Sequence, residues 1–235
     1  ISTNNEQSLV TQIALVPSVS DQTAFYCSDS KQYQLTGNGD GVIYWYKDAT
    51  ETTPFAYGNN TSTATAPNNG KFYAGLNEYS STFGPKNKYE TRLGGGSYLQ
   101  TSGGVLIRTF APTILESARL YIGHSGTIRF YIKNSQGMEI SSSTVKVTAT
   151  RSTPVDGPAE DDLTDQGQVY TLNLKIPIAG NYSIHASYED GATIFRNNTV
   201  PRSIYPLSSQ LDVFKIIGND ATGPQADYYY FYGLK

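Results

Sequence analysis

The sequence is poor in cysteine and in charge. Cys27 is the only cysteine among 235 residues, which excludes an internal disulfide framework. Charged residues make up 16% of the chain and the formal net charge is −3, so no basic surface for a nucleic-acid partner is expected. No apolar run approaches the roughly 18 residues that a membrane helix needs, so we expect no membrane insertion.

Motifs of known catalytic sites are also missing. The sequence contains no nucleophile elbow, phosphate-binding loop, dinucleotide fingerprint or His-Glu-x-x-His. Its two histidines, His124 and His185, lack the helical spacing of a metal site and have no second histidine or cysteine nearby. We therefore expect no catalytic residues and a protein that is not an enzyme. Only a catalytic triad assembled across the fold is left open.

Gly, Tyr, Thr, Ser and Asn are abundant instead, which is typical of an extracellular β-protein with many turns. No segment of ten or more residues has the 3.6-residue period of an amphipathic helix. The length suits one large β domain or two ordinary ones. Because the chain begins at Ile1 without Met or a signal-like segment, we expect a mature fragment or an excised piece.

Five consecutive aromatic residues, Tyr228–Tyr232, stand near the C-terminus. Aromatic residues favour strands, and on a strand successive side chains point to opposite faces. Both faces of this strand would be aromatic, which is expected for a strand covered on both sides rather than for an exposed edge. The run therefore predicts an interior strand that closes a β-sandwich.

The C-terminal half shows regular alternation of apolar and polar residues. Ile128, Phe130 and Ile132 alternate with polar neighbours, and similar patterns follow around residues 145–149, 170–176 and 182–188. Alternation of this kind predicts strands with one face on a core and one on solvent. With about eight strands between Val105 and Leu234, a jelly-roll sandwich is favoured, and an immunoglobulin-like sandwich is the alternative.

Gly- and Pro-containing segments at residues 84–88 and 94–97 bracket a change in composition, which predicts a domain boundary. The expected organisation is all-β. A lead-in segment covers residues 1–16, an immunoglobulin-like sandwich residues 17–90, and a jelly-roll-like sandwich residues 91–235.

The first half carries a family resemblance. Tyr26-Cys27, the segment Ile43–Ala49 around Trp45, and Gly70–Ala74 resemble immunoglobulin-like modules of large bacterial surface proteins exported by type IX secretion. The resemblance covers about residues 14–90 and implies that Trp45 lies in the sandwich core. The family has a second cysteine where this chain has Glu78–Thr82. We therefore expect Cys27 to be unpaired, buried and next to Trp45.

The second half resembles a β-sandwich module that follows such repeats. The matching segments are Leu120–Gly123, Gly167–Leu174, Ile194–Asn198, Tyr205-Pro206 and Tyr228–Tyr232. This resemblance covers most of residues 92–235. It implies a secreted or cell-surface location rather than a particular chemistry.

One loop gathers five acids within ten residues. Carboxylates so close together are stable when solvated or when bound to a cation, and Ca²⁺ takes six to eight oxygen ligands. The spacing does not match an EF-hand, so a solvated acidic loop and a structural Ca²⁺ site both remain open. No other cofactor is indicated. The candidate metal ligands are Asp156, Glu160, Asp161, Asp162 and Asp165.

A carbohydrate site needs exposed aromatic rings beside planar polar groups, because sugar rings stack on the former and hydroxyls bond to the latter. Scattered surface tyrosines are the alternative explanation for any exposed ring in a chain with 19 tyrosines. The candidate ligand-binding residues in the second half are Tyr121, Tyr131, Asn173, His185, Arg196, Asn197 and Asn198.

Taken together, the sequence predicts a non-catalytic pair of modules from a secreted bacterial adhesin, with an extracellular glycan or neighbouring surface-protein modules as partners. Two alternatives remain. The chain could be a purely structural spacer, or the accessory region of a secreted hydrolase whose catalytic domain lies elsewhere.

Overall fold

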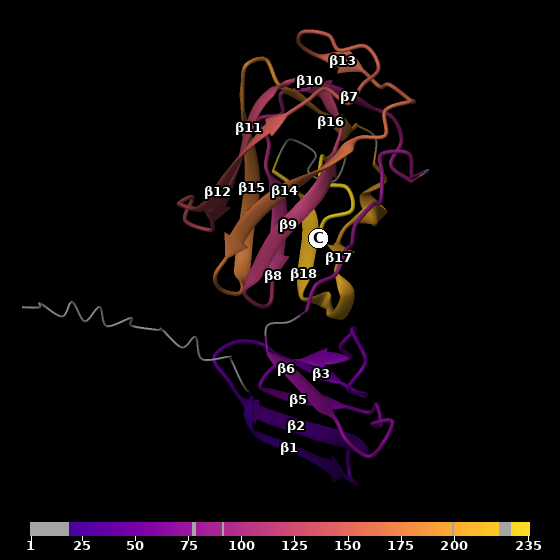
Figure 1. Ribbon diagram of the computed structural model, residues 1–235, viewed down its shortest axis with the longest axis vertical. Helices are drawn as coiled ribbons and strands as arrows, with labels where there is room; N and C mark the ends of the chain where they lie inside the picture. Colours follow the sequence, from indigo (N-terminus) through magenta and orange to yellow (C-terminus); the bar gives the residue numbers. More distant parts are fainter. Residues whose placement is uncertain (1–18, 77–78, 91, 199, 221–226) are drawn as a thin grey trace, which may run out of the picture. The chain divides into compact units, whose positions relative to one another are not determined.

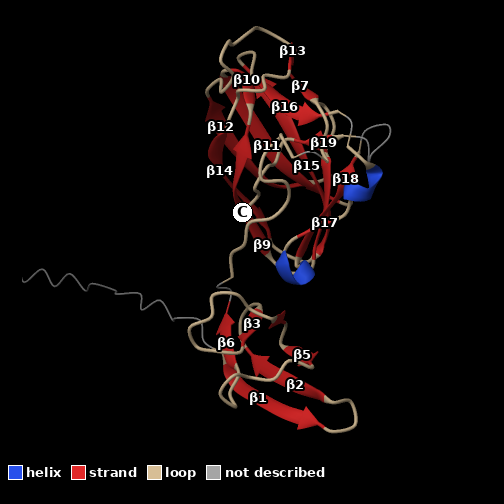
Figure 2. Ribbon diagram, turned by 90° about the vertical axis from the view of Figure 1, so that its right-hand side faces the viewer, coloured by secondary structure: helices blue, strands red, loops and turns tan. Residues whose placement is uncertain are grey.

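The computed structural model describes residues 19–76, 79–90, 92–198, 200–220 and 227–235. Within these ranges the protein is all-β and contains no α-helix, as predicted. Its strands form several antiparallel sheets, and two short 3-10 helices cover Arg202–Ile204 and Gln210–Asp212 (Figure 2). The predicted lead-in segment, residues 1–16, lies outside the described residues. The chain forms two compact units, residues 1–79 and 80–235.

The first unit contains two three-stranded antiparallel sheets, ordered β1-β2-β5 and β4-β3-β6. Its strands are β1 (Ser20–Cys27), β2 (Gln32–Asn38), β3 (Ile43–Tyr46), β4 (Ala56–Tyr57), β5 (Asn60–Thr63) and β6 (Tyr73–Leu76). The buried residues Leu35, Ile43, Trp45 and Leu76 come from both sheets and form one cluster. The unit is therefore held together by apolar contact between its two sheets.

Trp45 is the largest side chain of this cluster and is only 2% exposed. Its ring nitrogen donates a hydrogen bond to the Gly58 carbonyl oxygen at 2.9 Å. The one polar atom of the side chain is therefore buried with a hydrogen-bond partner. The predicted core position of Trp45 is confirmed.

Cys27 is unpaired, as expected, but it is neither buried nor next to Trp45. Cys27 ends β1, faces Gln32 in the β1–β2 hairpin and is partly exposed. It does not belong to the cluster around Trp45. The physical reason is that β1 is an exposed strand, so the apolar residues Phe25 and Tyr26 before the cysteine also face solvent.

The division between the two units falls between Tyr79 and Ser80, whereas the sequence predicted a boundary near residue 90. Residues 80–90 pack with the second unit. Phe83 forms a β-bridge with Leu234, and Lys88 is buried inside that unit. Residues 84–88 are therefore an irregular part of the second unit rather than a linker, and residues 96 and 97 already belong to a strand of that unit.

The second unit has a β-sandwich-like architecture, and all its strand pairs are antiparallel (Figure 1). One sheet has the order β12-β11-β15-β8-β18-β17, a second the order β10-β16-β7-β13 with β19 beside β16, and a third pairs β14 with β9. The strands are β7 (Gly96–Leu99), β8 (Val105–Thr109), β9 (Thr113–Leu120), β10 (Ile122–His124), β11 (Gly126–Asn134), β12 (Glu139–Val147), β13 (Ala159–Glu160), β14 (Gln168–Ile176), β15 (Gly180–Glu189), β16 (Thr193–Asn197), β17 (Leu207–Ser208), β18 (Phe214–Asn219) and β19 (Tyr228–Tyr229).

The predicted alternation is confirmed on the long strands. On β11 the side chains of Ile128, Phe130 and Ile132 are buried while their neighbours are partly exposed, and β14 and β15 repeat this pattern. These inward side chains belong to one large core cluster that draws on all three sheets. Core packing therefore does not constrain which side chains stand on the outward side of β11 and β15.

The C-terminal aromatic run is buried, but it is not the continuous strand that alternation predicted. All five side chains of Tyr228–Tyr232 are at most 3% exposed, yet strand β19 covers only the first two residues. Tyr230 has φ 35°, a left-handed conformation that ends the strand. The main chain then turns and forms hydrogen bonds with Arg119 of β9 and with Phe83. The five side chains are therefore buried by contacts with several surrounding segments, and not by lying on the two covered faces of one strand.

Replacing Trp45 with Ala should destabilise the first unit by about 3–5 kcal/mol, because the substitution empties a large aromatic site in a small core. The matched control is Phe25→Ala, since Phe25 is 56% exposed on β1. Calorimetric unfolding of the intact chain measures both variants. Equal effects of the two substitutions would contradict the core assignment of Trp45.

A chain that ends at Asp227 should lose the cooperative unfolding transition of the second unit. Burying one large apolar side chain contributes about 1.5–3 kcal/mol, so five such side chains approach the 5–15 kcal/mol that stabilises a whole domain. The control is a chain that lacks only Lys235, whose side chain is 48% exposed. Near-ultraviolet circular dichroism during heating is the measurement. A cooperative transition retained by the shorter chain would show that the segment is dispensable.

Candidate functional site

The structure brings two of the predicted ligand-binding residues together on the solvent-facing side of the six-stranded sheet. Tyr131 on β11 and His185 on β15 lie directly opposite each other in the antiparallel register. Their rings stack with centroids 5.4 Å apart and planes inclined by 19°. Both point outward because their strand neighbours, including Phe130 and Ile184, point into the core.

Polar and cationic groups surround this pair. The Arg129 guanidinium and the Lys133 amine lie 5.0 and 5.5 Å from the centre of the Tyr131 ring. The Ser183 hydroxyl lies 2.8 Å from His185 Nε2, and Asp220 Oδ2 lies 3.9 Å from the same nitrogen. We call Arg129, Tyr131, Lys133, Ser183 and His185 the outer face.

Partial burial lowers the pKa of His185, the nearby Asp220 carboxylate acts to raise it, and Lys133 lowers it further. The folded-state pKa therefore lies below the ordinary value for histidine. The imidazole is neutral at neutral pH, so one ring nitrogen can donate a hydrogen bond and the other can accept one.

Further polar side chains lie beside the outer face on neighbouring strands. Ser142 and Thr144 of β12 lie opposite Tyr131 and Arg129 and are exposed. In the other direction, Arg108 of β8 lies opposite Lys215 of β18. The sheet thus carries an aromatic pair within a surface rich in hydroxyl and cationic groups.

Two predicted ligand residues are instead in the interior. Tyr121 was expected on a solvent face but is only 1% exposed. It falls between the end of β9 at Leu120 and the start of β10 at Ile122, so the alternation is interrupted at this residue. Its ring packs at 88° to that of Tyr232, with centroids 5.1 Å apart. The expectation of an exposed Tyr121 is therefore wrong.

Asn197 is also buried. It was a candidate for sugar binding, but it ends β16 and is 0% exposed. Its amide nitrogen donates to the Lys88 and Gly94 carbonyl oxygens at 3.2 and 2.9 Å, and its oxygen accepts from the Tyr232 hydroxyl at 2.5 Å. These bonds occupy the whole amide group, so Asn197 has a structural role.

The other three candidates do not join the Tyr131–His185 pair. Arg196 forms an ion pair with Asp227 at 3.0 Å, and the Asn198 amide donates to the Ser97 hydroxyl at 3.2 Å. Asn173 is exposed on β14 within a register shift, and its φ of 50° is one that Asn tolerates. The predicted set is therefore divided among separate places on the second unit.

The five carboxylates of the acidic loop are not gathered into a cation site. Asp156 contacts His124 Nε2 at 2.8 Å, while Glu160 is exposed in β13. Asp161, Asp162 and Asp165 each bind other protein groups. Among the described residues, no group of three or more potential ligands could hold a metal ion. The structure thus gives the Ca²⁺ alternative no support.

Asp162 organises the loop around itself. One oxygen accepts hydrogen bonds from the main-chain N–H and hydroxyl of Ser152, and the other accepts the same two bonds from Thr164, at 2.6–2.9 Å. These four bonds, led by the Thr164 hydroxyl, hold the pKa of the Asp162 carboxyl well below its ordinary value.

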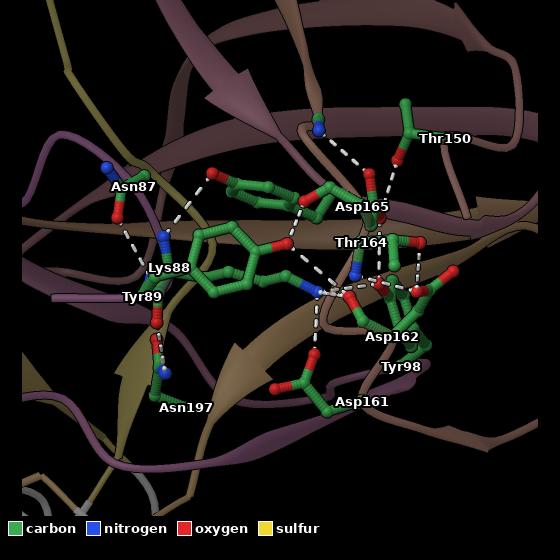
Figure 3. A network of polar contacts seen from close by, with 12 residues as sticks. Asn87, Lys88, Tyr89, Tyr98, Thr150, Asp161, Asp162, Thr164, Asp165 and Asn197 are labelled. Atoms are coloured by element: carbon green, nitrogen blue, oxygen red, sulfur yellow. Dashed lines mark hydrogen bonds and ion pairs between the residues drawn. The ribbon is translucent and has the colours of Figure 1, made fainter. Parts of the chain in front are cut away.

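Lys88, which was not among the residues predicted from the sequence, lies at the centre of this region. Its side chain is 0% exposed, and Nζ donates to Asp161 Oδ1 at 2.6 Å, the Asp162 carbonyl oxygen at 2.7 Å and the Tyr98 hydroxyl at 2.8 Å (Figure 3). Three partners satisfy the three N–H donors of an ammonium group. No local sequence pattern predicts that Lys88 is buried and hydrogen-bonded in this way, because it lies in an irregular segment and its partners are distant in the sequence.

Aromatic rings enclose the same amine. Nζ lies 4.4 Å from the centre of the Phe195 ring and 5.0–5.2 Å from those of Tyr89, Tyr98 and Tyr121. Burial lowers the pKa of Lys88, and the hydrogen bond and charge of Asp161 act in the opposite direction. The net direction is downward.

Models of known protein families, curated proteins and solved structures were each compared with the chain, and none of the three comparisons found a match. Among the residues that the structure describes, no helix has the length and apolarity to cross a membrane.

Asp162→Asn should make the protein less stable at neutral pH and flatten its stability between about pH 5 and pH 2. The depressed pKa means that the carboxylate stabilises the fold above its unfolded-state pKa of about 4, and that this contribution is lost as the pH falls. Melting temperatures across this range are the measurement. Asp156→Asn is the control, because Asp156 has a 95% exposed side chain. A wild-type pH profile in Asp162→Asn would contradict the role of these hydrogen bonds.

Proposed function

We propose that this chain is a non-catalytic pair of modules from a secreted bacterial surface protein, and that its second unit binds glycan through the outer face. The first module would be an immunoglobulin-like spacer and the second a jelly-roll-like sandwich. The all-β architecture in two compact units supports this proposal. The family resemblance and the extracellular location are parts of the same proposal.

The observation that carries the glycan proposal is the stacked pair of Tyr131 and His185 on an outward sheet face. Partly exposed rings offer apolar surface to sugar C–H groups, while hydroxyl, imidazole and guanidinium groups bond to sugar hydroxyls. Strands of a sheet hold these groups more rigidly than loops would, which reduces the entropy lost on binding. The outer face brings all these groups together on two neighbouring strands, β11 and β15.

The charges around the pair favour an acidic sugar. Arg129 and Lys133 flank the Tyr131 ring, and Arg108 and Lys215 lie further along the same side. Glu139 forms an ion pair with Arg129, and Asp212 forms one with Lys215, so part of this positive charge is balanced. Lys133 and Arg108 would then contribute most to binding a carboxylate- or sulfate-bearing glycan.

A glycan array probed with the intact chain tests this proposal, and titration of the best ligand follows. Tyr131→Ala and His185→Ala should each weaken binding about tenfold, since 1.4 kcal/mol corresponds to a factor of ten and a lost stacking contact is of that size. The matched control is Tyr26→Ala, an exposed tyrosine of the first unit, which should bind like the wild type.

Two results would contradict the glycan proposal. Absence of binding across the array would favour the spacer alternative, in which the modules only separate other parts of a larger protein. Binding that survives both substitutions would place the glycan elsewhere on the surface. Binding at the outer face would fit both an adhesin and the accessory region of a hydrolase.

A further inference from the structure

The amine of Lys88 and the carboxylate of Asp161 are held in direct contact inside the second unit. Nζ lies 2.6 Å from Oδ1, and the lysine side chain is 0% exposed whereas that of Asp161 is 21% exposed. The Tyr98 hydroxyl and the Asp162 carbonyl oxygen hold Nζ from other directions. A nucleophile is thus fixed next to an acyl carbon, which is the arrangement that removes the entropic barrier to their reaction.

The surroundings of the amine exclude water. Four aromatic rings lie within 5.2 Å of Nζ, namely those of Tyr89, Tyr98, Tyr121 and Phe195. Their faces stabilise an ammonium group, whereas burial lowers the pKa of Lys88 by more than the hydrogen bond and charges of the nearby carboxylates raise it. A lowered pKa increases the fraction of neutral amine, which is the nucleophilic form.

A path for the proton leads away from the amine. Nζ donates to the Tyr98 hydroxyl at 2.8 Å, and this hydroxyl donates to Asp165 Oδ2 at 2.7 Å. Asp165 is 2% exposed and also accepts from the Thr150 hydroxyl and the Gly167 N–H. Amine, phenol and carboxylate are therefore connected in series, with donor directions that suit proton transfer from Lys88 to Asp165.

We propose that Lys88 and Asp161 become joined by an intramolecular isopeptide bond between Nζ and Cγ. The ammonium first gives one proton to the Asp161 carboxylate that it contacts, which leaves a neutral amine beside a neutral carboxyl group. The amine lone pair then attacks Cγ, and a second amine proton passes through the Tyr98 hydroxyl to Asp165. Asp165 returns this proton to the hydroxyl group of the tetrahedral intermediate, which leaves as water as the C–O bond breaks. The ammonium and carboxylate together become a neutral amide and one water molecule, so no oxidant, reductant or co-substrate is required.

The bond would cross-link distant parts of the second unit. Lys88 and Asp161 are separated by 73 positions in the sequence, and the bond would tie the segment before β7 to the acidic loop after β13. Replacing the ion pair by an amide also removes the charge of an amine whose side chain is 0% exposed. Such a cross-link persists in denaturant and is independent of the glycan proposal.

Mass spectrometry of the intact chain tests the proposal. Protein that has been folded, purified and incubated at neutral pH should weigh less than its sequence by one water molecule. Tryptic peptides containing Lys88 and Asp161 should be recovered joined, without cleavage after Lys88. A chain kept in denaturant from the outset should retain its full mass, because only the fold brings the two groups together.

Variants separate the cross-link from other losses of water. Lys88→Met and Asp161→Ala should have full mass, and Asp156→Ala, in the same loop, should still lose water. Tyr98→Phe keeps the ring but removes the hydroxyl, so it should slow the reaction about a hundredfold or more.

The wild-type result decides the matter even if a variant fails to fold. Full mass in the folded and incubated wild type overturns the proposal, as does a loss of water that maps to another position, such as the Asp156-Gly157 pair.

Discussion

The burial of the aromatic segment Tyr228–Tyr232 is the constraint on which the second unit depends. Tyr228–Tyr232 brings five aromatic side chains into the interior, where none is more than 3% exposed. An unpaired buried polar group costs about 1–3 kcal/mol, so such a segment needs partners for its hydroxyl and main-chain groups. The hydroxyls of Tyr228, Tyr230 and Tyr232 all donate hydrogen bonds, and the main chain bonds to β9 and to the segment before β7.

The buried aromatic segment is also connected to Lys88 through hydrogen bonds and ring packing. The Tyr232 hydroxyl donates to Asn197, and the Asn197 amide donates to the Lys88 carbonyl oxygen. The Tyr232 ring also packs on Tyr121, whose hydroxyl accepts the main-chain N–H of Lys88. The last residues of the chain therefore help to hold the lysine whose amine contacts Asp161. Buried polar networks of this kind make one arrangement more stable than its competitors, because every member needs the others to be satisfied.

The outer face is independent of this interior because of the two-residue period of a strand. Phe130 and Ile132 of β11 enter the core, whereas Tyr131 between them faces solvent, and His185 of β15 stands opposite it. Side chains on that side can thus change without altering the packing beneath them. Binding chemistry on the surface and cross-linking chemistry inside would use different residues of the same β-sandwich-like unit.

The sequence by itself determined the all-β class, the inward and outward sides of β11, β14 and β15, and the burial of Trp45. Each of these follows from strand periodicity or from the apolar area of a single residue, which are local properties. Only the tertiary structure decided that Tyr121 is buried and that Lys88 meets Asp161 across 73 positions. Tyr121 lies at a break between two strands, where the alternation of inward and outward side chains shifts, and no local sequence pattern marks that break. The contact between Lys88 and Asp161 joins two segments far apart in the sequence, so it depends on how the loops that carry them pack against the sheets.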